Sequence, residues 1–243
     1  GLQQQRQIGI HAITASTPMP TLVGPATIDG YTQPGAAANS SVTASNAVIQ
    51  IEIAAPNLGL FVDGTNATLR GLAIFGALAS VAGVTLAGSG HRVEGCFIGL
   101  RADGQTAAGL PIAGINAVNG SGHHIGGALP AQRNVIASNG GGAGGIGGIQ
   151  LQGMTNVEID GNLLGTDRSG TLPRGNAPSA LFAKLGVNDI RIGNQAPNLI
   201  RFNAAGVLID AQSSAISAYA NDYTDNVGLA IDLSAVQGAP DGL

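Results

Sequence analysis

The sequence predicts an all-β chain wound as a single-stranded, right-handed parallel β-helix, a solenoid of about ten coils with about 22–24 residues in each. Short apolar runs recur along the chain, glycine supplies 39 of the 243 residues, and Gly, Asn or Asp closes most runs. Strands this short cannot bury a face alone. Stacked coils solve that problem because each strand then pairs with its equivalent in the next coil.

The spacing of matching segments sets the predicted coil length. The segment that begins at Leu69 matches the one that begins at Val93, and we interpret the interval between them as one coil. A further copy begins at Ile159, and we interpret the interval from Val93 to Ile159 as three coils. Gly206 and Gly228 begin matching runs one coil apart. A helical solenoid is disfavoured because glycine interrupts the apolar runs.

Asparagines that follow apolar runs predict hydrogen-bonded ladders along the solenoid. We expect Asn139 to stack over Asn162, and Asn203 over Asn226, because the members of each pair are one predicted coil length apart. Asn tolerates the left-handed backbone of a tight corner, and stacked Asn side chains can bond to each other. These residues are therefore predicted to be structural rather than ligand contacts.

The chain is predicted to form one domain. Residues 1–45, which contain four prolines, fit the repeat least well and are assigned as an N-terminal cap or first coils, and residues 46–243 form the β-helix body. Three loops are expected to leave the coils, near Leu100–Ile112, Gly140–Gly147 and Thr166–Pro178. The first and third follow matching strands, so both should project from the same side.

Composition excludes several classes of partner. The net charge is −4 and the ten Lys and Arg are scattered, whereas nucleic-acid binding needs clustered basic residues. We also predict no membrane span, because no apolar run approaches the roughly 20 residues that cross a bilayer. The single cysteine, Cys96, lies in an apolar strand pattern and is expected to be buried.

Asp210 and Asp232 are the candidate metal ligands. They belong to matching runs one coil apart, so they are expected to stack about 5 Å apart on neighbouring coils. Two carboxylates that close favour a cation between them, and calcium is the natural choice. The alternative is a solvated pair whose side chains splay apart. No cofactor other than this possible calcium is predicted, and no catalytic residue is assigned.

The histidines give a second metal hypothesis, which the sequence disfavours. His123 and His124 are adjacent, so on a strand they point to opposite faces and cannot share a metal.

Three segments carry a family resemblance. They are Ile28–Gly35, the segment from Ile125 to Asn139, and Gly161–Thr171. Together they resemble the repeat of large bacterial extracellular proteins with right-handed parallel β-helix domains, which belong to the pectate-lyase-like superfamily. The resemblance covers the chain from about Thr21 to Leu233. It implies the fold and an extracellular or cell-surface location. The superfamily also includes lyases and glycoside hydrolases of acidic polysaccharides.

Three functions are compatible with these features. The first is a non-enzymatic extracellular scaffold, such as an adhesin stalk or a self-assembling fibre subunit, whose partners are copies of itself or other cell-surface proteins. The second is a polysaccharide lyase or glycoside hydrolase acting on an acidic polysaccharide. It would need a groove with three or more carboxylates and an Arg or Lys. The third is an ice- or carbohydrate-binding module, which the lack of a shared register among the threonines disfavours.

Overall fold

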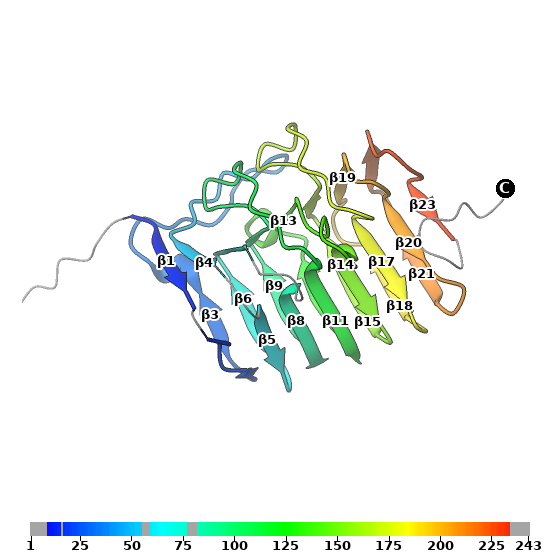
Figure 1. Cartoon of the computed structure of the whole chain (residues 1–243), viewed down its shortest axis with the longest axis horizontal. Coiled ribbons are helices and arrows are strands. Elements are labelled where there is room, and N and C mark those ends of the chain that lie inside the picture. The colour runs from blue at the N-terminus through cyan, green and yellow to red at the C-terminus, as the bar shows by residue number, and fades with distance from the viewer. Residues whose placement is uncertain (1–8, 16, 55–58, 77–81, 234–243) are drawn as a thin grey trace, which may run out of the picture.

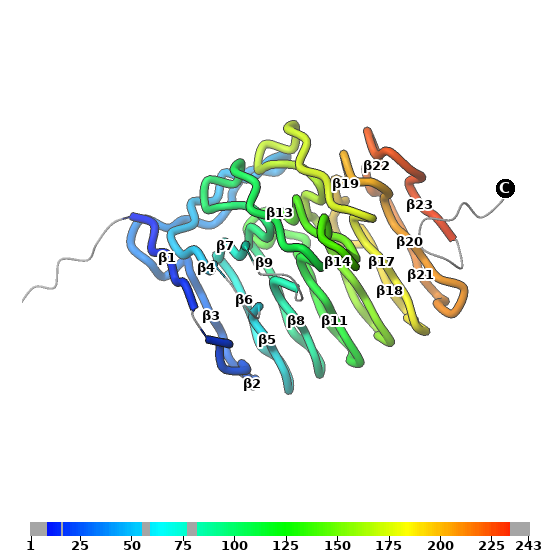
Figure 2. Tube along the Cα trace, viewed as in Figure 1, coloured from blue at the N-terminus to red at the C-terminus, as the bar shows by residue number. Residues whose placement is uncertain are grey.

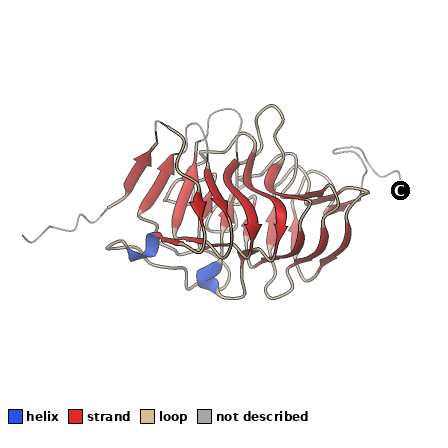
Figure 3. Ribbon diagram, turned by 90° about the horizontal axis from the view of Figure 1, so that it is seen from below, coloured by secondary structure: helices blue, strands red, loops and turns tan. Residues whose placement is uncertain are grey.

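Nearly all regular structure in this protein is β. The computed structural model describes residues 9–15, 17–54, 59–76 and 82–233. Within these ranges there are 23 strands and two 3-10 turns, η1 (Gly30–Thr32) and η2 (Pro130–Gln132), which lie on the same side of the molecule in Figure 3. The prediction of an all-β chain is confirmed.

The strands form three ladders, and every pairing within them is parallel. Ladder A contains β1 (His11–Thr14), β4 (Ile51–Ala54), β7 (Leu72–Phe75), β10 (Phe97–Ile98), β13 (Val135–Ile136), β16 (Leu163–Leu164), β19 (Leu199–Arg201) and β22 (Asp222–Thr224). Ladder B contains β2 (Leu22–Val23), β5 (Leu60–Asp63), β8 (Ala82–Ser89), β11 (Ala113–Ser121), β14 (Gly147–Gln152), β17 (Leu181–Lys184), β20 (Val207–Ile209) and β23 (Ile231–Asp232). Ladder C contains β3 (Thr27–Asp29), β6 (Thr68–Arg70), β9 (Arg92–Glu94), β12 (His124–Gly126), β15 (Thr155–Asp160), β18 (Asn188–Ile192) and β21 (Ser214–Ala218).

The chain visits the ladders in the order A, B, C and then repeats that order along its length (Figure 1). Each strand therefore meets its equivalent from the next round, which fits a parallel β-helix. In the described part of the chain, ladder A contains eight strands, so the strands support about eight coils rather than the predicted ten.

The interpretation of the interval from Val93 to Ile159 as three coils is wrong. Leu69 pairs with Val93, so the predicted coil length is confirmed there. Val93 pairs with Ile125, and Ile125 pairs with Ile159, so the longer interval spans two coils and not three. The middle coils are longer than the repeat because they carry the loops.

Aliphatic residues stack in rows inside the three ladders. Because side chains alternate across a strand, every second residue points inward. In ladder B the inward row consists of Leu60, Val84, Ile115, Ile149, Leu181 and Val207, all of them buried. Ladders A and C add similar rows to one continuous core. Fully burying each such side chain contributes roughly 1.5–3 kcal/mol.

A second apolar cluster covers the outer face of ladder A. It includes Phe97, Val135 and Leu163 from the strands, together with Leu100 and Ala102 from a loop. Two loops reach this face. Each is closed at its base by an antiparallel bridge, one from Leu100 to Ala107 and the other from Thr166 to Pro173.

The two loops project from the same side of the molecule, as the sequence predicted (Figure 2). They also lie side by side, since the Arg168 N–H donates to the Gly104 carbonyl. Both faces of ladder A are therefore packed against protein at its middle strands, whereas β1 at the first coil is mostly exposed.

The described part of residues 1–45 continues the ladders. Strands β1, β2 and β3 pair in parallel with β4, β5 and β6. Residues 37–48 then cross toward the two loops, where the Ser45 N–H donates to the Arg168 carbonyl. A capping role for the first 45 residues stays a prediction.

Candidate functional site

The outer face of ladder C carries a row of polar and charged side chains. Its members pair in register from coil to coil. We call these residues the outer row: Thr27, Thr68, Arg92, His124, Glu158, Arg191 and Ser217. Their neighbours in sequence, including Val93, Ile125 and Ile159, are fully buried. The alternation that fills the core therefore also places these polar groups outside.

His124 and Glu158 form a hydrogen-bonded pair at the centre of the outer row. The Nδ1 atom of His124 lies 3.1 Å from Oε2 of Glu158. An ionised carboxylate only accepts hydrogen bonds, so Nδ1 carries the proton and Nε2 keeps its lone pair. Burial, and next the charge of Arg92, lower the pKa of His124 below its ordinary value. This shift favours the neutral imidazole.

Neighbouring side chains fix the position of Glu158. Arg191 donates from Nε to Oε1 of Glu158 at 3.3 Å, and the Gln195 side-chain amide donates to Oε2. Arg191 also bonds to Asp189 and to the Asn156 side chain. Each guanidinium nitrogen of Arg191 thus has a protein partner, and this arrangement positions Glu158.

Arg92 differs from Arg191 because its guanidinium is available. It is exposed and directly opposite His124 in the next coil. Its main-chain N–H donates to the Ala67 carbonyl, but among the described residues its side chain has no hydrogen-bond or ion-pair partner. An exposed, unpaired guanidinium can bind a carboxylate in a bidentate manner.

A second polar row runs beside the outer row. Its members lie two residues further along the same strands, toward their carboxyl ends. Arg70 lies between Asp29 and Glu94, with nitrogen–oxygen distances of 3.5 and 3.8 Å respectively. Asp160 follows shortly after Glu158 and accepts a hydrogen bond from the Gln195 N–H. Burial raises the pKa of Asp160. This face thus carries carboxylates and arginines side by side.

Asp210 and Asp232 do not stack as predicted. Asp232 pairs with Leu208, because the last two coils pair in a different register from the one that the repeat predicted. The position opposite Asp210 falls beyond Leu233, outside the described residues. Asp210 instead accepts hydrogen bonds from the Leu185 N–H and the Ser213 hydroxyl, which lower its pKa against the opposing effect of burial.

The register therefore gives no stacked calcium pair. Within the described ranges, no group of three or more His, Cys, Asp or Glu side chains is arranged to hold a metal ion.

The asparagines form two ladders rather than the predicted pairs. In one, amide hydrogen bonds link Asn139, Asn176, Asn203 and Asn226 in succession. In the other, they link Asn134, Asn162, Asn198 and Asn221. The expected pairing of Asn139 with Asn162 is wrong because these residues occupy different corners, whereas Asn203 does bond to Asn226.

Several other predicted residues are placed clearly. Cys96 is fully buried, and burial raises its pKa to about 12, so it is a packing residue. His123 points into the core while His124 points outward, as adjacent strand residues must. Thr27 and Thr68 do share a register, but Arg92 follows them, so the row does not continue as threonines.

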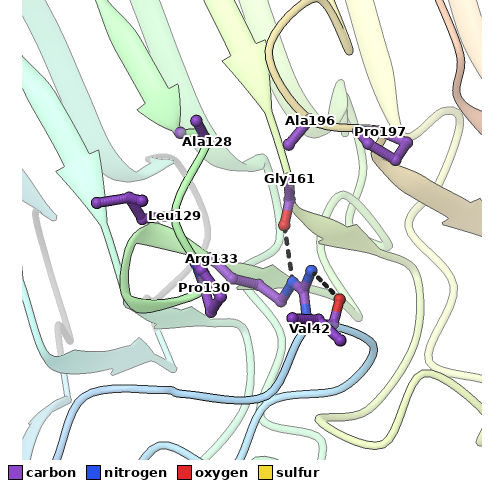
Figure 4. A pocket seen from close by; sticks show the side chains of 9 residues that line it. Val42, Ala128, Leu129, Pro130, Arg133, Gly161, Ala196 and Pro197 are labelled. Atoms are coloured by element: carbon purple, nitrogen blue, oxygen red, sulfur yellow. Dashed lines mark hydrogen bonds between the residues drawn. The ribbon is translucent and has the colours of Figure 1, made fainter.

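A small pocket lies where the 39–46 segment meets the turn around η2 (Figure 4). Its volume is ≈ 160 Å³. It is lined by Val42, Gly127, Ala128, Leu129, Pro130, Arg133, Gly161, Ala196 and Pro197.

Arg133 is the charged residue of this pocket, and it donates to the carbonyls of Ser41, Val42, Ala44 and Gly161. The guanidinium therefore clamps the 41–44 backbone to the coils.

No helix in the described ranges is long and apolar enough to cross a membrane. No protein family and no curated protein matches this chain. Among solved structures, an alginate lyase from Paenibacillus sp. str. FPU-7 is similar over 93% of this chain and 91% of that chain. The sequence identity is 14% and the TM-score is 0.26, which is too weak to support an argument about activity.

Proposed function

We propose that the outer row is the active site of a polysaccharide lyase that acts on a polymer of uronic acid sugars. The observation that carries the proposal is the hydrogen bond between His124 and Glu158, beside the unpaired guanidinium of Arg92. A neutral imidazole held by a carboxylate is a general base, and a free arginine next to it is a carboxylate site.

The proposed reaction is a β-elimination that begins at the α-carbon, the carbon that bears the substrate carboxylate. Arg92 pairs with that carboxylate and stabilises the charge that develops on it when the α-carbon loses its proton. Nε2 of His124 accepts the proton, and Glu158 stabilises the resulting imidazolium. The electron pair of the broken C–H bond forms a carbon–carbon double bond. The glycosidic C–O bond on the neighbouring carbon breaks, and the leaving oxygen takes up a proton from solvent.

The roles of the carboxylates favour a lyase over a glycoside hydrolase. A hydrolase needs one carboxylate as acid and a second as base or nucleophile. Glu158 is committed to His124, Arg191 and Gln195. Glu94 is committed to Arg70 and Gln132. The group with a free lone pair in the outer row is instead an imidazole.

The test is ultraviolet absorbance of unsaturated products from pectate, alginate and a glycosaminoglycan. We expect His124→Gln to lower the rate by about a hundredfold or more, because a general base contributes 10²–10⁴-fold. Arg92→Gln should raise KM for the polymer and also lower kcat, because Arg92 both binds the carboxylate and stabilises the charge that develops on it. Activity should fall in acid, with a midpoint below the ordinary histidine pKa. Arg174→Gln, at an arginine in a loop over ladder A, is the matched control and should leave the rate unchanged.

Two results would refute this assignment. One is the absence of both product and binding for every uronate polymer tested. The other is cleavage that His124→Gln leaves intact.

A scaffold is the second candidate function. It is supported by the two asparagine ladders and by the loops that pack on ladder A, because both stiffen a stack of coils.

The right-handed sense of the coils is also part of the proposal, and it follows from the general rule that parallel crossover connections are right-handed. An extracellular or cell-surface location also stays a proposal, and fractionation of the native host would test it.

A further inference from the structure

The two ends of the stack of coils present strand edges. Among the described residues, β1, β2 and β3 each pair with a strand on one side only, and the same is true of β21, β22 and β23. These two sets lie at opposite ends of the molecule (Figure 1). Unpaired backbone donors and acceptors along such an edge can pair with a strand of another chain.

Both ends also expose large apolar side chains. At the first coil, Ile13 in β1 and Val23 in β2 are 49% and 66% exposed. At the last coil, Val227 is 89% exposed, and Leu229 and Ile231 are 50% and 39% exposed. The equivalent residue of Ile231 in the preceding coil, Val207, is fully buried. A further coil placed against either end would bury these groups.

The asparagine ladders give the last coil a polarity. Asn203 donates from its main-chain N–H and from its side-chain amide to Oδ1 of Asn226. Asn226 donates once, to the Ile200 carbonyl, and in the described residues makes no donation toward a following coil. The end of this ladder therefore presents donors. Two last coils placed face to face would oppose donors with donors.

We propose that copies of this chain associate end to end, with the last coil of one copy against the first coil of the next. A parallel strand edge is satisfied by another edge of the same spacing and direction, and the first coil of a second copy supplies one. The contact joins two different surfaces, so it propagates into an open filament unless the rotation closes a ring. This inference does not rest on the proposed lyase activity.

The experiment uses one blocked variant for each end. Val227→Lys places a charge on the last coil, and Ile13→Lys places one on the first. Val42→Lys is the matched control, because Val42 is 74% exposed on a loop away from both ends. Circular dichroism establishes that each variant retains its β structure. Sedimentation velocity over a range of concentrations, with electron microscopy of the most concentrated samples, measures association.

We expect the unmodified chain and Val42→Lys to form oligomers that lengthen with concentration. Each end-blocked variant alone should be monomeric. An equal mixture of the two should form dimers that grow no further, because each variant keeps one open end and the dimer uses both. A monomeric unmodified chain would overturn the proposal. So would dimers of Ile13→Lys alone, which would indicate pairing of two last coils, or of Val227→Lys alone, which would indicate pairing of two first coils.

Discussion

At the residue scale, two buried histidines accept main-chain hydrogen bonds from the preceding coil, as the ladder asparagines do elsewhere in the stack. The Ala67 N–H donates to Nδ1 of His91 at 3.1 Å, and the His91 N–H donates to Nδ1 of His123 at 3.1 Å. The rings stack with their centroids 5.1 Å apart. An Nδ1 atom that accepts a hydrogen bond carries no proton, so this arrangement requires a neutral imidazole at His123.

Folding should therefore become less favourable in acid. Burial, followed by the charges of His91 and His124, lowers the pKa of His123 from 6.5 to about 4. Between these values the unfolded chain binds a proton that the folded chain does not. The contribution of His123 to the free energy of unfolding should be constant above pH 6.5 and fall by about 3 kcal/mol as the pH drops to 4. Urea unfolding at a series of pH values measures this change.

His123→Asn is the variant that isolates this effect. Its Oδ1 can occupy the place of Nδ1 and accept from the His91 N–H without titrating. The variant should lose most of the decline between pH 6.5 and 4 that belongs to His123. An equally steep decline in both proteins would assign the acid sensitivity to other groups.

At the scale of elements, the corners between strands hold the coils in register. Asn162 accepts from the Asn134 side-chain amide and donates to the Ile125 carbonyl and to Asn198. Every one of these partners is buried, so its loss leaves polar groups unsatisfied at a cost of about 1–3 kcal/mol each.

We expect Asn162→Ala to lower the free energy of unfolding by about 3–5 kcal/mol, since several buried groups lose a partner together. Asn188→Ala is the control. Asn188 is exposed and its amide donates to the Ser214 hydroxyl, so its removal should cost less than about 1 kcal/mol. Equal losses in the two variants, measured by urea unfolding, would show that the ladder does not stabilise the fold.

The same corners show why sequence alone predicted the ladders incompletely. Spacing identified asparagine as the corner residue, and it paired Asn203 with Asn226 because that coil carries no long loop. It failed for Asn139, whose true neighbour Asn176 is separated from it by a loop. A constant offset cannot reveal register when loops of different length leave successive coils. The outer row was missed for a related reason, because Arg92, His124 and Glu158 are separated by unequal intervals.

At the scale of the whole molecule, stability should vary along the stack. Each coil contacts its neighbours on either side, so a central coil is supported twice and an end coil once. The burial patterns already differ: β12 has two buried residues in three, whereas β21 is mostly exposed. Local opening is easiest where few apolar contacts must break.

Amide hydrogen exchange measured by mass spectrometry should therefore give a gradient along the chain. Peptides from β12 and β15 should exchange most slowly, and those from β21, β22 and β23 at least tenfold faster. Raising the protein concentration should slow exchange in the end strands and leave the central ones unchanged, because end-to-end association adds a neighbour only at the ends. Uniform exchange along the stack would mean that the coils open as one cooperative unit, and the separate contribution of each coil would then have to be abandoned.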